Sequence, residues 1–423
     1  MKIMVIGSGG REHAIIKKLK KSRRVGEIYA LPGNGGIARD AVCVDIDAKD
    51  IDAQVRFAVE NGVDFAVVAP DDPLVLGAVD RLTDAGIPCF GPNKAAAAIE
   101  GSKVFAKDLM KKYGIPTAAY EVFDDPAEAV AYLEGAKYPT VIKADGLALG
   151  KGVIIAESFE EAKAAVRSVM EEKRFGESGS KIVIEEFLRG PEVSVLAFTD
   201  GKTVVPMVSS MDHKRALDGD LGPNTGGMGT VAPNPYYTKS IADECMNSIF
   251  MPTVRAMCAE GRPFRGCLYF GLMLTENGPR VIEYNCRFGD PEAQVVLPLL
   301  DCDLLEVMIA VSEGRLADAD VRIRDGCAAC VIVASGGYPG KYQTGYEISV
   351  PEDAADSIIY AGVRASGDKI FTSGGRVLGV TATAKTLKEA LDEAYAKATK
   401  VKFENAFYRR DIGKKALCAA EAK

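Results

Sequence analysis

Strand-like and helix-like segments alternate along the first hundred residues, and this order constrains the fold more than any other feature of the sequence. Short apolar runs at Lys2–Ile6 and Phe65–Ala69 are typical of buried strands. Apolar residues at helical spacing follow at Glu12–Lys20 and at Pro73–Ala85. Strands separated by helices pair in parallel, because each helix returns the chain to the same edge of the sheet. The sequence therefore predicts an α/β fold whose N-terminal domain, residues 1–100, is a doubly wound parallel sheet.

Two further domains are expected after this sheet, in keeping with a length of 423 residues. Residues 101–320 form the predicted central domain, and residues from about 121 to 190 form a smaller subdomain within it, with two strand pairs. The amphipathic segment Phe159–Glu172 predicts a helix in this subdomain. Strand-like runs dominate from residue 321, which predicts a C-terminal β-rich α+β domain at 321–423.

Composition and charge narrow the class of protein. An apolar fraction of 48% and a charged fraction of 26% are ordinary for soluble globular proteins. We expect no membrane span and no secretion signal, because no apolar run has the required length. The net charge of −7 comes without a block of Lys and Arg, so nucleic acid is not an expected partner. Ten scattered cysteines, with a single C-x-x-C at Cys327 and Cys330, indicate reduced thiols in a cytoplasmic enzyme.

The glycine-rich turn Gly7–His13 is the first candidate anion site. It lies between a predicted strand and a predicted helix, where free backbone N–H groups and the helix dipole favour a phosphate. A dinucleotide fingerprint, G-x-G-x-x-G, requires glycine at its sixth position, where this chain has Glu12. A carboxylate is repelled by a pyrophosphate, which disfavours NAD and an oxidoreductase. The alternative interpretation is a tight turn without a ligand.

A second glycine-rich segment lies between two predicted strands, at residues 143–153. Gly146 and Gly150 have three residues between them, and a strand follows where a P-loop would require a helix. The segment is therefore predicted to be a flexible hairpin lid. Its backbone amides can fold over phosphates, and Lys143 and Lys151 can supply positive charge.

The strand Val281–Asn285 carries a candidate metal pair. Side chains alternate along a strand, so Glu283 and Asn285 point to the same face and offer two hard oxygens suited to Mg²⁺. Arg287 follows and can bind a carboxylate or a phosphate. This pattern indicates chemistry on an anionic substrate held against a metal–nucleotide. The alternative interpretation is a strand that ends in a salt-bridged turn.

Two other segments have the composition of ligand-binding loops. The apolar strand Lys181–Ile184 leads into a linker whose backbone groups can face the edge of an adenine, with Glu192 placed to accept hydrogen bonds from ribose. The alternative interpretation is a surface bend. Met211–Gly229 is rich in Gly, Asn and Asp, which predicts a mostly irregular loop around a polar ligand.

Together these motifs resemble the ATP-grasp superfamily and, within it, the phosphoribosylamine–glycine ligase family, and the resemblance spans the whole chain. The hairpin lid and the Glu-x-Asn strand are generic to the superfamily. GREHA, DHKR with GPNTGGMG, and NCRFGDPE point to this ligase family. The segments that carry the resemblance are GSGGREHA at 7–14, PGNGG at 32–36, GSKVFAK at 101–107, KADGLALGKGV at 143–153, EEFL at 185–188, DHKR at 212–215, GPNTGGMG at 222–229, EYNCRFGDPE at 283–292 and SGGYPG at 335–340.

The resemblance implies a central ATP-grasp domain with a lid subdomain, and ATP-dependent joining of glycine to 5-phosphoribosylamine. Glycyl phosphate is the implied intermediate, and glycinamide ribonucleotide, ADP and phosphate are the implied products, in de novo purine biosynthesis. Mg²⁺ or Mn²⁺ is the implied cofactor and ATP the co-substrate. Glycine, the amino sugar and ATP are then the small-molecule partners of a monomer or weak homo-oligomer.

The resemblance also implies roles for individual residues. ATP would contact Lys103, Lys143, Asp145, Gly146, Gly150, Lys151, Gly152, Glu185, Glu186, Leu188 and Glu192. The amino sugar and glycine would contact Gly9, Gly10, Arg11, Gly33, Asn34, Gly35, Asp212, Lys214, Asn224, Thr225, Gly226, Gly227 and Arg287. The metal would bind Glu283 and Asn285, and catalysis would involve Lys143, Lys214 and Arg287.

Three alternatives stay open beside this interpretation. An ATP-grasp carboxylase or formyltransferase would use a different acyl donor, and DHKR and GREHA argue against it. A dinucleotide-dependent oxidoreductase depends on the N-terminal turn alone. A nucleotide-binding regulator without catalysis would be free to lose Lys143, Glu283, Asn285 and Arg287, which are all present. One departure from the superfamily is Gly271, which stands where many members carry a third metal-binding carboxylate.

Overall fold

The computed structural model describes residues 1–147 and 152–421. Its N-terminal sheet has five parallel strands in the order β3-β2-β1-β4-β5, which confirms the predicted doubly wound arrangement. The strands are β1 (Lys2–Gly7), β2 (Glu27–Pro32), β3 (Val42–Cys43), β4 (Phe65–Val68) and β5 (Cys89–Phe90). The helices of this domain are α1 (Gly10–Leu19), α2 (Ile51–Glu60), α3 (Asp71–Leu76), α4 (Ala78–Asp84) and α5 (Lys94–Gly101).

The central strand β1 is buried on both faces. Ile3 and Val5 pack with α1 on one face, whereas Met4 and Ile6 pack with α2 and α4 on the other. Both sets of side chains are fully buried, which is why the strand reads as a continuous apolar run.

The predicted helix Pro73–Ala85 is wrong in one respect, because the structure has two helices, α3 and α4, that meet at Gly77. Gly77 has φ +96°, a left-handed conformation that ends α3 and that glycine adopts without steric penalty. Helix α5 was not predicted; it begins after Asn93, whose side chain accepts a hydrogen bond from the amide of Ala96.

The subdomain predicted at about 121–190 is a four-stranded sheet in the order β6-β9-β7-β8. Strands β7 and β8 form the predicted hairpin, and α8 continues as a π-helical turn, Arg167–Glu171, over the predicted length. This subdomain has a hydrophobic core of its own, formed by a separate cluster of buried side chains. Its elements are β6 (Tyr120–Phe123), α7 (Pro126–Glu134), β7 (Thr140–Ala144), β8 (Val153–Ala156), α8 (Phe159–Val166) and β9 (Ile182–Glu186).

A second four-stranded sheet, with the order β11-β10-β16-β17, forms the centre of the molecule. Its long antiparallel pairs place Gly271 opposite Glu283 and Tyr269 opposite Asn285. The strands are β10 (Glu192–Asp200), β11 (Val204–Pro206), β16 (Arg265–Thr275) and β17 (Gly278–Asn285). The helices of the central domain are α6 (Lys103–Tyr113), α9 (Lys239–Cys245), α10 (Met251–Ala259), α11 (Ala293–Leu299) and α12 (Leu304–Glu313).

The C-terminal sheet has the order β12-β15-β18-β22-β19, with β23 paired to β18. It is not built from residues 321–423 alone, because β12 and β15 come from the segment 211–232. Its strands are β12 (Met211–Asp212), β15 (Gly229–Ala232), β18 (Cys327–Ser335), β19 (Ile358–Tyr360), β22 (Arg376–Ala384) and β23 (Ala406–Phe407). The hairpin β20 (Val363–Ser366) and β21 (Lys369–Thr372) and the helices α13 (Leu387–Ala398) and α14 (Lys414–Glu421) complete the domain.

The prediction of a mostly irregular loop over Met211–Gly229 is therefore wrong. Besides β12 and β15, the segment contains a small hairpin of β13 (Arg215–Leu217) and β14 (Leu221–Asn224). Its glycines mark turns between short strands, and the strand that β15 pairs with, β18, lies about a hundred residues further along the chain.

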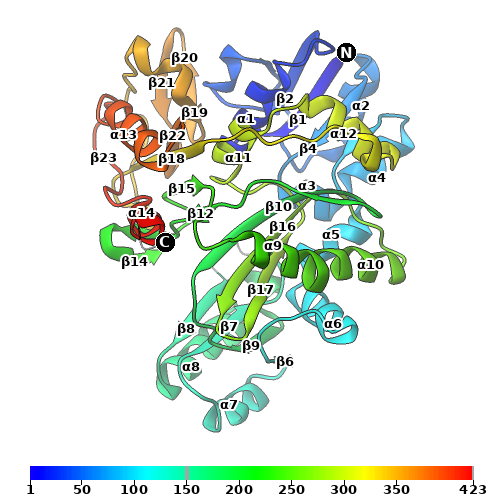
Figure 1. Ribbon diagram of the computed structural model, residues 1–423, viewed down its shortest axis with the longest axis vertical. Coiled ribbons are helices and arrows are strands. Elements are labelled where there is room, and N and C mark those ends of the chain that lie inside the picture. Colours follow the sequence, from blue (N-terminus) through cyan, green and yellow to red (C-terminus); the bar gives the residue numbers. More distant parts are fainter. Residues whose placement is uncertain (148–151, 422–423) are drawn as a thin grey trace.

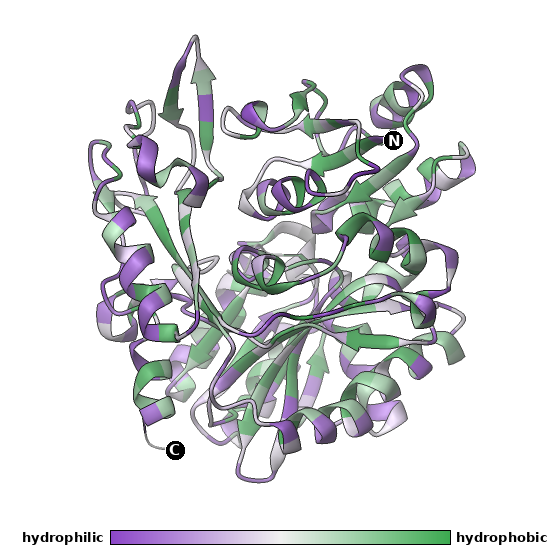
Figure 2. Cartoon of the chain, turned by 45° about the horizontal axis from the view of Figure 1, so that its top comes forward, coloured by the Kyte–Doolittle hydropathy of each residue, from purple (hydrophilic) through white to green (hydrophobic). Residues whose placement is uncertain are grey.

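Figure 1 shows how the parts are arranged. The N-terminal and C-terminal domains lie side by side at one end, the lid subdomain lies at the other, and β10, β16 and β17 run between them. Figure 2 shows hydrophobic residues concentrated on the strands and hydrophilic residues on the outer faces of the helices. Within residues 1–147 and 152–421, no helix combines the length and hydropathy that a membrane span requires.

Candidate active site

The end of β17 carries the predicted metal pair in the expected arrangement. Glu283 and Asn285 occupy alternate positions of the strand and so point to one face, which confirms their alternation. Burial alone would raise the pKa of Glu283, but the positive charges of nearby side chains outweigh it and hold this pKa below its ordinary value. These side chains are Lys214, Lys143, Lys103 and Arg287.

The three lysines whose charges act on Glu283 come from three different segments of the chain. Lys214, between β12 and β13, has its Nζ 3.5 Å from an oxygen of Glu283 and 3.5 Å from one of Glu192. Lys143, in β7, donates to the carbonyl of Ile282 at 3.0 Å. Lys103 begins α6 and donates to the carbonyl of Gly146 at 2.8 Å. The structure therefore gathers cations that lie far apart in the sequence around one carboxylate.

Glu185 does not present a free carboxylate, because two lysines hold it. It is buried and lies 2.9 Å from the Nζ of Lys107 and 2.9 Å from the Nζ of Lys143. Burial lowers the pKa of Lys107 to about 8. No role was predicted for Lys107, although its spacing of one helical turn from Lys103 in α6 is a signal that could have identified it. Glu185 thus orients Lys143, and any contact with adenine falls to backbone groups around it.

Asp145, at the start of the hairpin that was predicted to be a lid, contacts the first residues of α6. Its carboxylate accepts hydrogen bonds from the hydroxyl of Ser102 and the amide of Val104, both at 3.1 Å. It therefore caps the start of the helix that carries Lys103. The carbonyl of Gly152 accepts the amide of Ala144 at 2.9 Å across the hairpin, whereas the predicted site residues Gly150 and Lys151 lie outside the described residues.

The glycine-rich turn after β1 is filled by a side chain of its own helix. Glu12 accepts the amide of Gly9 at 2.5 Å and lies 2.6 Å from the Nε of Arg11. A Cβ at Gly7 would come within 2.6 Å of the Glu12 side chain, so the glycine makes room for this carboxylate. The helix start is thereby capped from within, in agreement with the argument against a dinucleotide. Arg11 also donates to the carbonyl of Phe288 at 3.2 Å, which joins this turn to the segment after β17.

The turn at 32–36 contacts the C-terminal domain. Asn34 donates to the carbonyls of Ser8 at 2.7 Å and Ala361 at 3.1 Å. A Cβ at Gly35 would lie 2.2 Å from the amide nitrogen of Ala365, so only glycine fits this close approach. The turn thus lies between the first glycine loop and the C-terminal domain, and its contact with substrate stays a prediction.

Two residues of the C-terminal domain, for which no role was predicted, hold the GPNTGGMG segment. Arg376 in β22 donates to the carbonyls of Gly226 and Asp290, both at 2.7 Å. The hydroxyl of Tyr338 accepts the amide of Gly226 at 3.1 Å. Tyr338 lies in SGGYPG, which was part of the resemblance, whereas no local signal marks Arg376. The hydroxyl of Thr225 donates to the carbonyl of Lys214 at 2.8 Å and accepts the amide of Gly227 at 2.9 Å, and its contact with substrate stays a prediction.

Three carboxylates, those of Asp212, Asp290 and Glu292, lie near this segment. Burial raises the pKa of Asp212, and the neighbouring Glu292 raises it further. Burial also acts to raise the pKa of Asp290, but Arg376 and Arg11 hold it below its ordinary value. Asp290 accepts the amide of Arg11 at 3.3 Å, so the Asp-Pro-Glu segment faces the first glycine loop as well.

Arg287 is oriented by a buried carboxylate. Its Nη2 donates to Glu100 at 2.7 Å and lies 3.7 Å from Asp71. The Nε atom is buried and has no hydrogen-bond partner among the described residues. The guanidinium is thus fixed at Nη2 and keeps an unused donor at Nε for an anion.

Remaining predicted residues lie on the elements that frame this region. Glu186 ends β9 and accepts the amide of Ala119 at 2.9 Å, and Leu188 follows in the connection to β10, which begins at Glu192. Gly10 begins α1, and Asn224 ends β14.

The donor set of β17 fits a hydrated divalent cation bound to phosphates. Glu283 is ionised and Asn285 adds a neutral oxygen on the same face, which matches the preference of Mg²⁺ for few protein ligands beside substrate phosphates. A third carboxylate has no room at position 271, because a Cβ there would lie 2.9 Å from Cγ of Glu283. Residues 1–147 and 152–421 contain no cluster of three or more His, Cys, Asp or Glu that could hold a metal alone.

Family models match most of the chain. The phosphoribosylglycinamide synthetase N domain matches residues 1–100, its ATP-grasp (A) domain matches 101–293 and its C domain matches 328–415. The phosphoribosylamine–glycine ligase of Caldanaerobacter subterraneus subsp. tengcongensis is 48% identical, over 97% of this chain and 99% of that protein. A human trifunctional purine biosynthetic protein is 47% identical, over 98% of this chain and 42% of its own length.

Solved structures also resemble this chain. The phosphoribosylamine–glycine ligase of Thermotoga maritima superposes with a TM-score of 0.87 at 37% identity, over 97% of this chain and 100% of that one. A biotin carboxylase from Campylobacter jejuni superposes with a TM-score of 0.75 at 14% identity, over 99% of this chain and 94% of that one. The second likeness concerns the fold alone.

Proposed function

The chain belongs to the phosphoribosylglycinamide synthetase family, and on this premise we propose that it joins glycine to 5-phosphoribosylamine with cleavage of ATP. The products are glycinamide ribonucleotide, ADP and phosphate, and the reaction belongs to de novo purine biosynthesis. The enzyme is an ATP-dependent carboxylate–amine ligase of the ATP-grasp type.

One observation supports this function above the others: the positive charges of side chains from separate elements converge on Glu283 and keep its carboxylate ionised. Lys103, Lys143 and Lys214 approach it from three elements. Like charges that converge on one point repel one another, and a bound anion of high charge offsets this repulsion. A nucleotide triphosphate supplies that charge, and catalysis of phosphoryl transfer needs mainly positioning and charge neutralisation.

The proposed reaction has two steps. A carboxylate oxygen of glycine attacks the γ-phosphorus of ATP, the bond from this phosphorus to the bridging oxygen breaks, and ADP leaves. The 1-amine of the sugar then attacks the acyl carbon of glycyl phosphate, phosphate leaves with the bonding electrons of the C–O bond, and the amine loses a proton. No enzyme nucleophile is required, because the glycine carboxylate and the sugar amine are the attacking groups of the two steps.

Individual residues have distinct tasks in this proposal. Arg287, fixed by Glu100, holds the glycine carboxylate in line with the γ-phosphate. Lys103 and Lys143 bind the phosphates below the lid, and Lys214 neutralises charge on the transferred group. Glu283 and Asn285 would hold Mg²⁺ or Mn²⁺, which supplies Lewis-acid charge to the phosphates when bound.

The amino sugar has a proposed place between three segments that the structure brings together. The turn at residues 9–11 and the segment after β17 are joined by Arg11, and Arg376 joins that segment to Gly226. The N-terminal turn contributes the cation Arg11 to these three segments. We therefore assign the phosphate of the sugar to a place next to Arg11. Gly226 and Gly227 then cover the ribose.

ADP release measured with Mg²⁺-ATP, with glycine, and with or without freshly generated phosphoribosylamine tests the function. We expect turnover only when all three substrates are present. ADP release that ignores the amine would keep the ATP chemistry and reject the acceptor. ATP binding without any ADP release would reject the enzyme and favour a nucleotide-binding regulator.

A further inference from the structure

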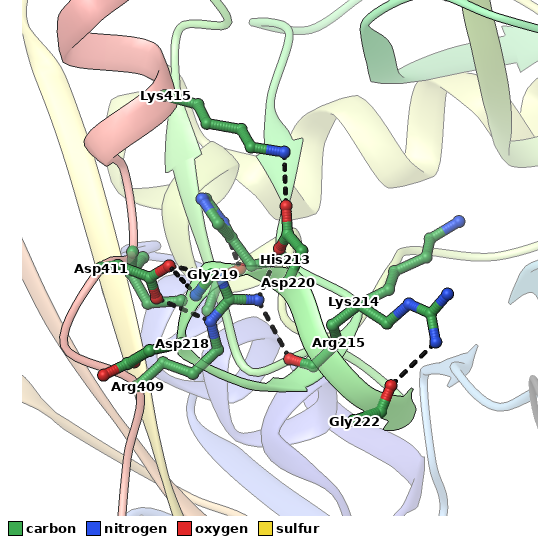
Figure 3. Close-up of polar contacts among 12 residues, drawn as sticks. His213, Lys214, Arg215, Asp218, Gly219, Asp220, Gly222, Arg409, Asp411 and Lys415 are labelled. Carbon is green, nitrogen blue, oxygen red and sulfur yellow. Dashed lines mark hydrogen bonds and ion pairs between the residues drawn. The ribbon is translucent and has the colours of Figure 1, made fainter.

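The backbone that carries Lys214 is attached to the C-terminal domain on its opposite side. Lys214 points to Glu192 and Glu283, while its neighbours His213 and Arg215 lie toward the C-terminal segment 409–415. Figure 3 shows the Lys214 side chain extending away from the cluster of charged groups around Arg409. One short stretch of chain therefore faces the candidate active site on one side and a separate polar cluster on the other.

Arg409 is the centre of this cluster, which we name the Arg409 clamp and which consists of Arg409, Asp220, Asp411 and the carbonyl of Arg215. The side chain of Arg409 is 2% exposed. It donates to Asp411 through Nε at 2.8 Å and Nη2 at 2.9 Å, and through Nη1 to Asp220 at 2.8 Å and to the carbonyl of Arg215 at 3.0 Å. These bonds require a guanidinium, because its planar donors reach both carboxylates and the carbonyl at once. A lysine ammonium is a compact charge and cannot form the paired bonds to Asp411.

The clamp continues through backbone groups on both sides. Asp411 accepts the amide of Gly219 at 2.8 Å, and Asp218 accepts the amide of Arg410 at 2.7 Å. The amide of Gly413 donates to Nε2 of His213 at 3.0 Å. The loop 213–220 is thus attached to the C-terminal segment at both of its ends (Figure 3).

The loop needs this support. Asp220 has φ +55°, a left-handed conformation that is unfavourable for residues other than glycine. The carboxylate of Asp220 is held by Arg409 and Lys415 together. Lysine is a long and flexible side chain, so the place of the Lys214 ammonium depends on a backbone that does not move.

We propose that Arg409 is a positioning residue for the ligation reaction: its clamp fixes the loop 213–220 so that Lys214 stays beside Glu283. The inference rests on the proposed function, because it takes Lys214 to act on the transferred group. It gives the C-terminal domain a part in catalysis through contacts that do not touch the substrate.

Arg409→Ala measured in the steady-state ADP assay tests the proposal. We expect kcat to fall about 100-fold, the size of effect that a small misplacement of a reacting group produces. The KM for ATP should stay within about threefold of wild type, because Lys103 and Lys143 belong to other elements. Arg410→Ala is the matched control, because its side chain makes no hydrogen bond or ion pair with any described residue, and it should keep the wild-type kcat.

A double variant separates positioning from general loss of stability. If Arg409 acts through Lys214, then Lys214→Ala with Arg409→Ala should be no slower than Lys214→Ala alone. Losses that multiply would overturn the proposal. Arg409→Lys keeps a charge beside Asp220 and serves if the alanine variant does not fold; we expect its kcat to fall about tenfold, and a wild-type kcat would also overturn the proposal.

Chemical rescue gives an independent readout. A cavity of about 600 Å³ lies beside Arg409, lined also by Tyr236, Lys414 and Cys418, and gives small solutes access. Millimolar guanidinium should restore part of the kcat of Arg409→Ala, and urea, which lacks the charge, should not. Equal effects of the two solutes would contradict the proposal. The wild-type protein in the same assay distinguishes the two hypotheses: without substrate-dependent ADP release the proposed function itself fails, whereas a normal wild type with a normal Arg409→Ala rejects the clamp alone.

Discussion

At the residue scale, Arg287 shows how a buried ion pair can prepare a binding group. Glu100 fixes one Nη atom of the guanidinium, and the Nε atom has no partner among the described residues. A buried polar group without a partner is unfavourable, so a bound carboxylate would stabilise it. Truncation to alanine would also leave the Glu100 charge unpaired, which makes lysine the more informative substitution.

Arg287→Lys should raise the KM for glycine about 100-fold, the value of one lost charge-assisted hydrogen bond pair. The KM for ATP should change by less than about threefold, because the phosphates are held by other cations. Steady-state kinetics with each substrate varied in turn measures both. An equal loss of ATP affinity would remove Arg287 from the glycine site.

His213 makes stability depend on pH. Burial, followed by the charge of Arg409, lowers its pKa from 6.5 to about 4. The unfolded chain therefore binds more protons between these two values, so the contribution is present above pH 6.5 and is lost as the pH falls toward 4. Complete loss corresponds to about 3 kcal/mol of unfolding free energy.

Urea unfolding of wild type and His213→Gln between pH 7 and pH 4 measures this dependence. We expect the variant to be less stable at neutral pH and to lose less stability on acidification, since it lacks the titrating group. Burial also lowers the pKa of His13, so His13 carries its own share of the wild-type slope, and comparing His213→Gln with wild type isolates the share of His213. A His213→Gln slope equal to that of wild type would show that other groups carry the acid sensitivity.

At the element scale, the β16–β17 pair determines how many ligands the metal receives. Gly271 lies opposite Glu283, and its missing side chain leaves space for the Glu283 side chain. Position 271 was singled out in the sequence because it lacks a carboxylate. The structure adds the reason that a carboxylate cannot be accommodated there while Glu283 keeps its place.

Gly271→Ala should therefore displace Glu283 while leaving both strands paired. We expect kcat to fall about tenfold or more and the Mg²⁺ concentration for half-maximal activity to rise, with a small change in Tm. A metal titration of activity and a thermal unfolding curve measure the two effects. Gly135→Ala, at the end of α7 with φ −100°, is the control and should match wild type in both.

At the scale of the whole molecule, the parts differ in how they are connected. The lid subdomain has its own sheet and its own hydrophobic cluster. The C-terminal sheet, in contrast, includes two strands from the segment 211–232, so the central and C-terminal domains cannot separate without breaking a sheet. Independent motion is therefore expected of the lid and not of the C-terminal domain.

Amide hydrogen exchange tests this difference. Without nucleotide, the strands β6 to β9 should exchange faster than β10 and β16, and Mg²⁺-ATP should slow the exchange of the lid specifically. The N-terminal sheet serves as the internal control, because its protection should not change. Uniform slowing across the molecule would indicate that ATP stabilises one rigid body and would reject a separately moving lid.

Features with a local physical signal could be predicted from the amino-acid sequence alone. Alternating strands and helices predicted the N-terminal sheet, the spacing of Glu283 and Asn285 placed both on one strand face, and Glu12 argued against a dinucleotide. Only the tertiary structure decided which strands the segment 211–232 pairs with, since these pairings leave no periodic pattern in a glycine-rich stretch. It also decided the roles of Arg376 and Arg409, which bind groups 150 and 189 residues away along the chain. An ion pair over such a distance is set by the packing of whole domains, and no local propensity encodes it.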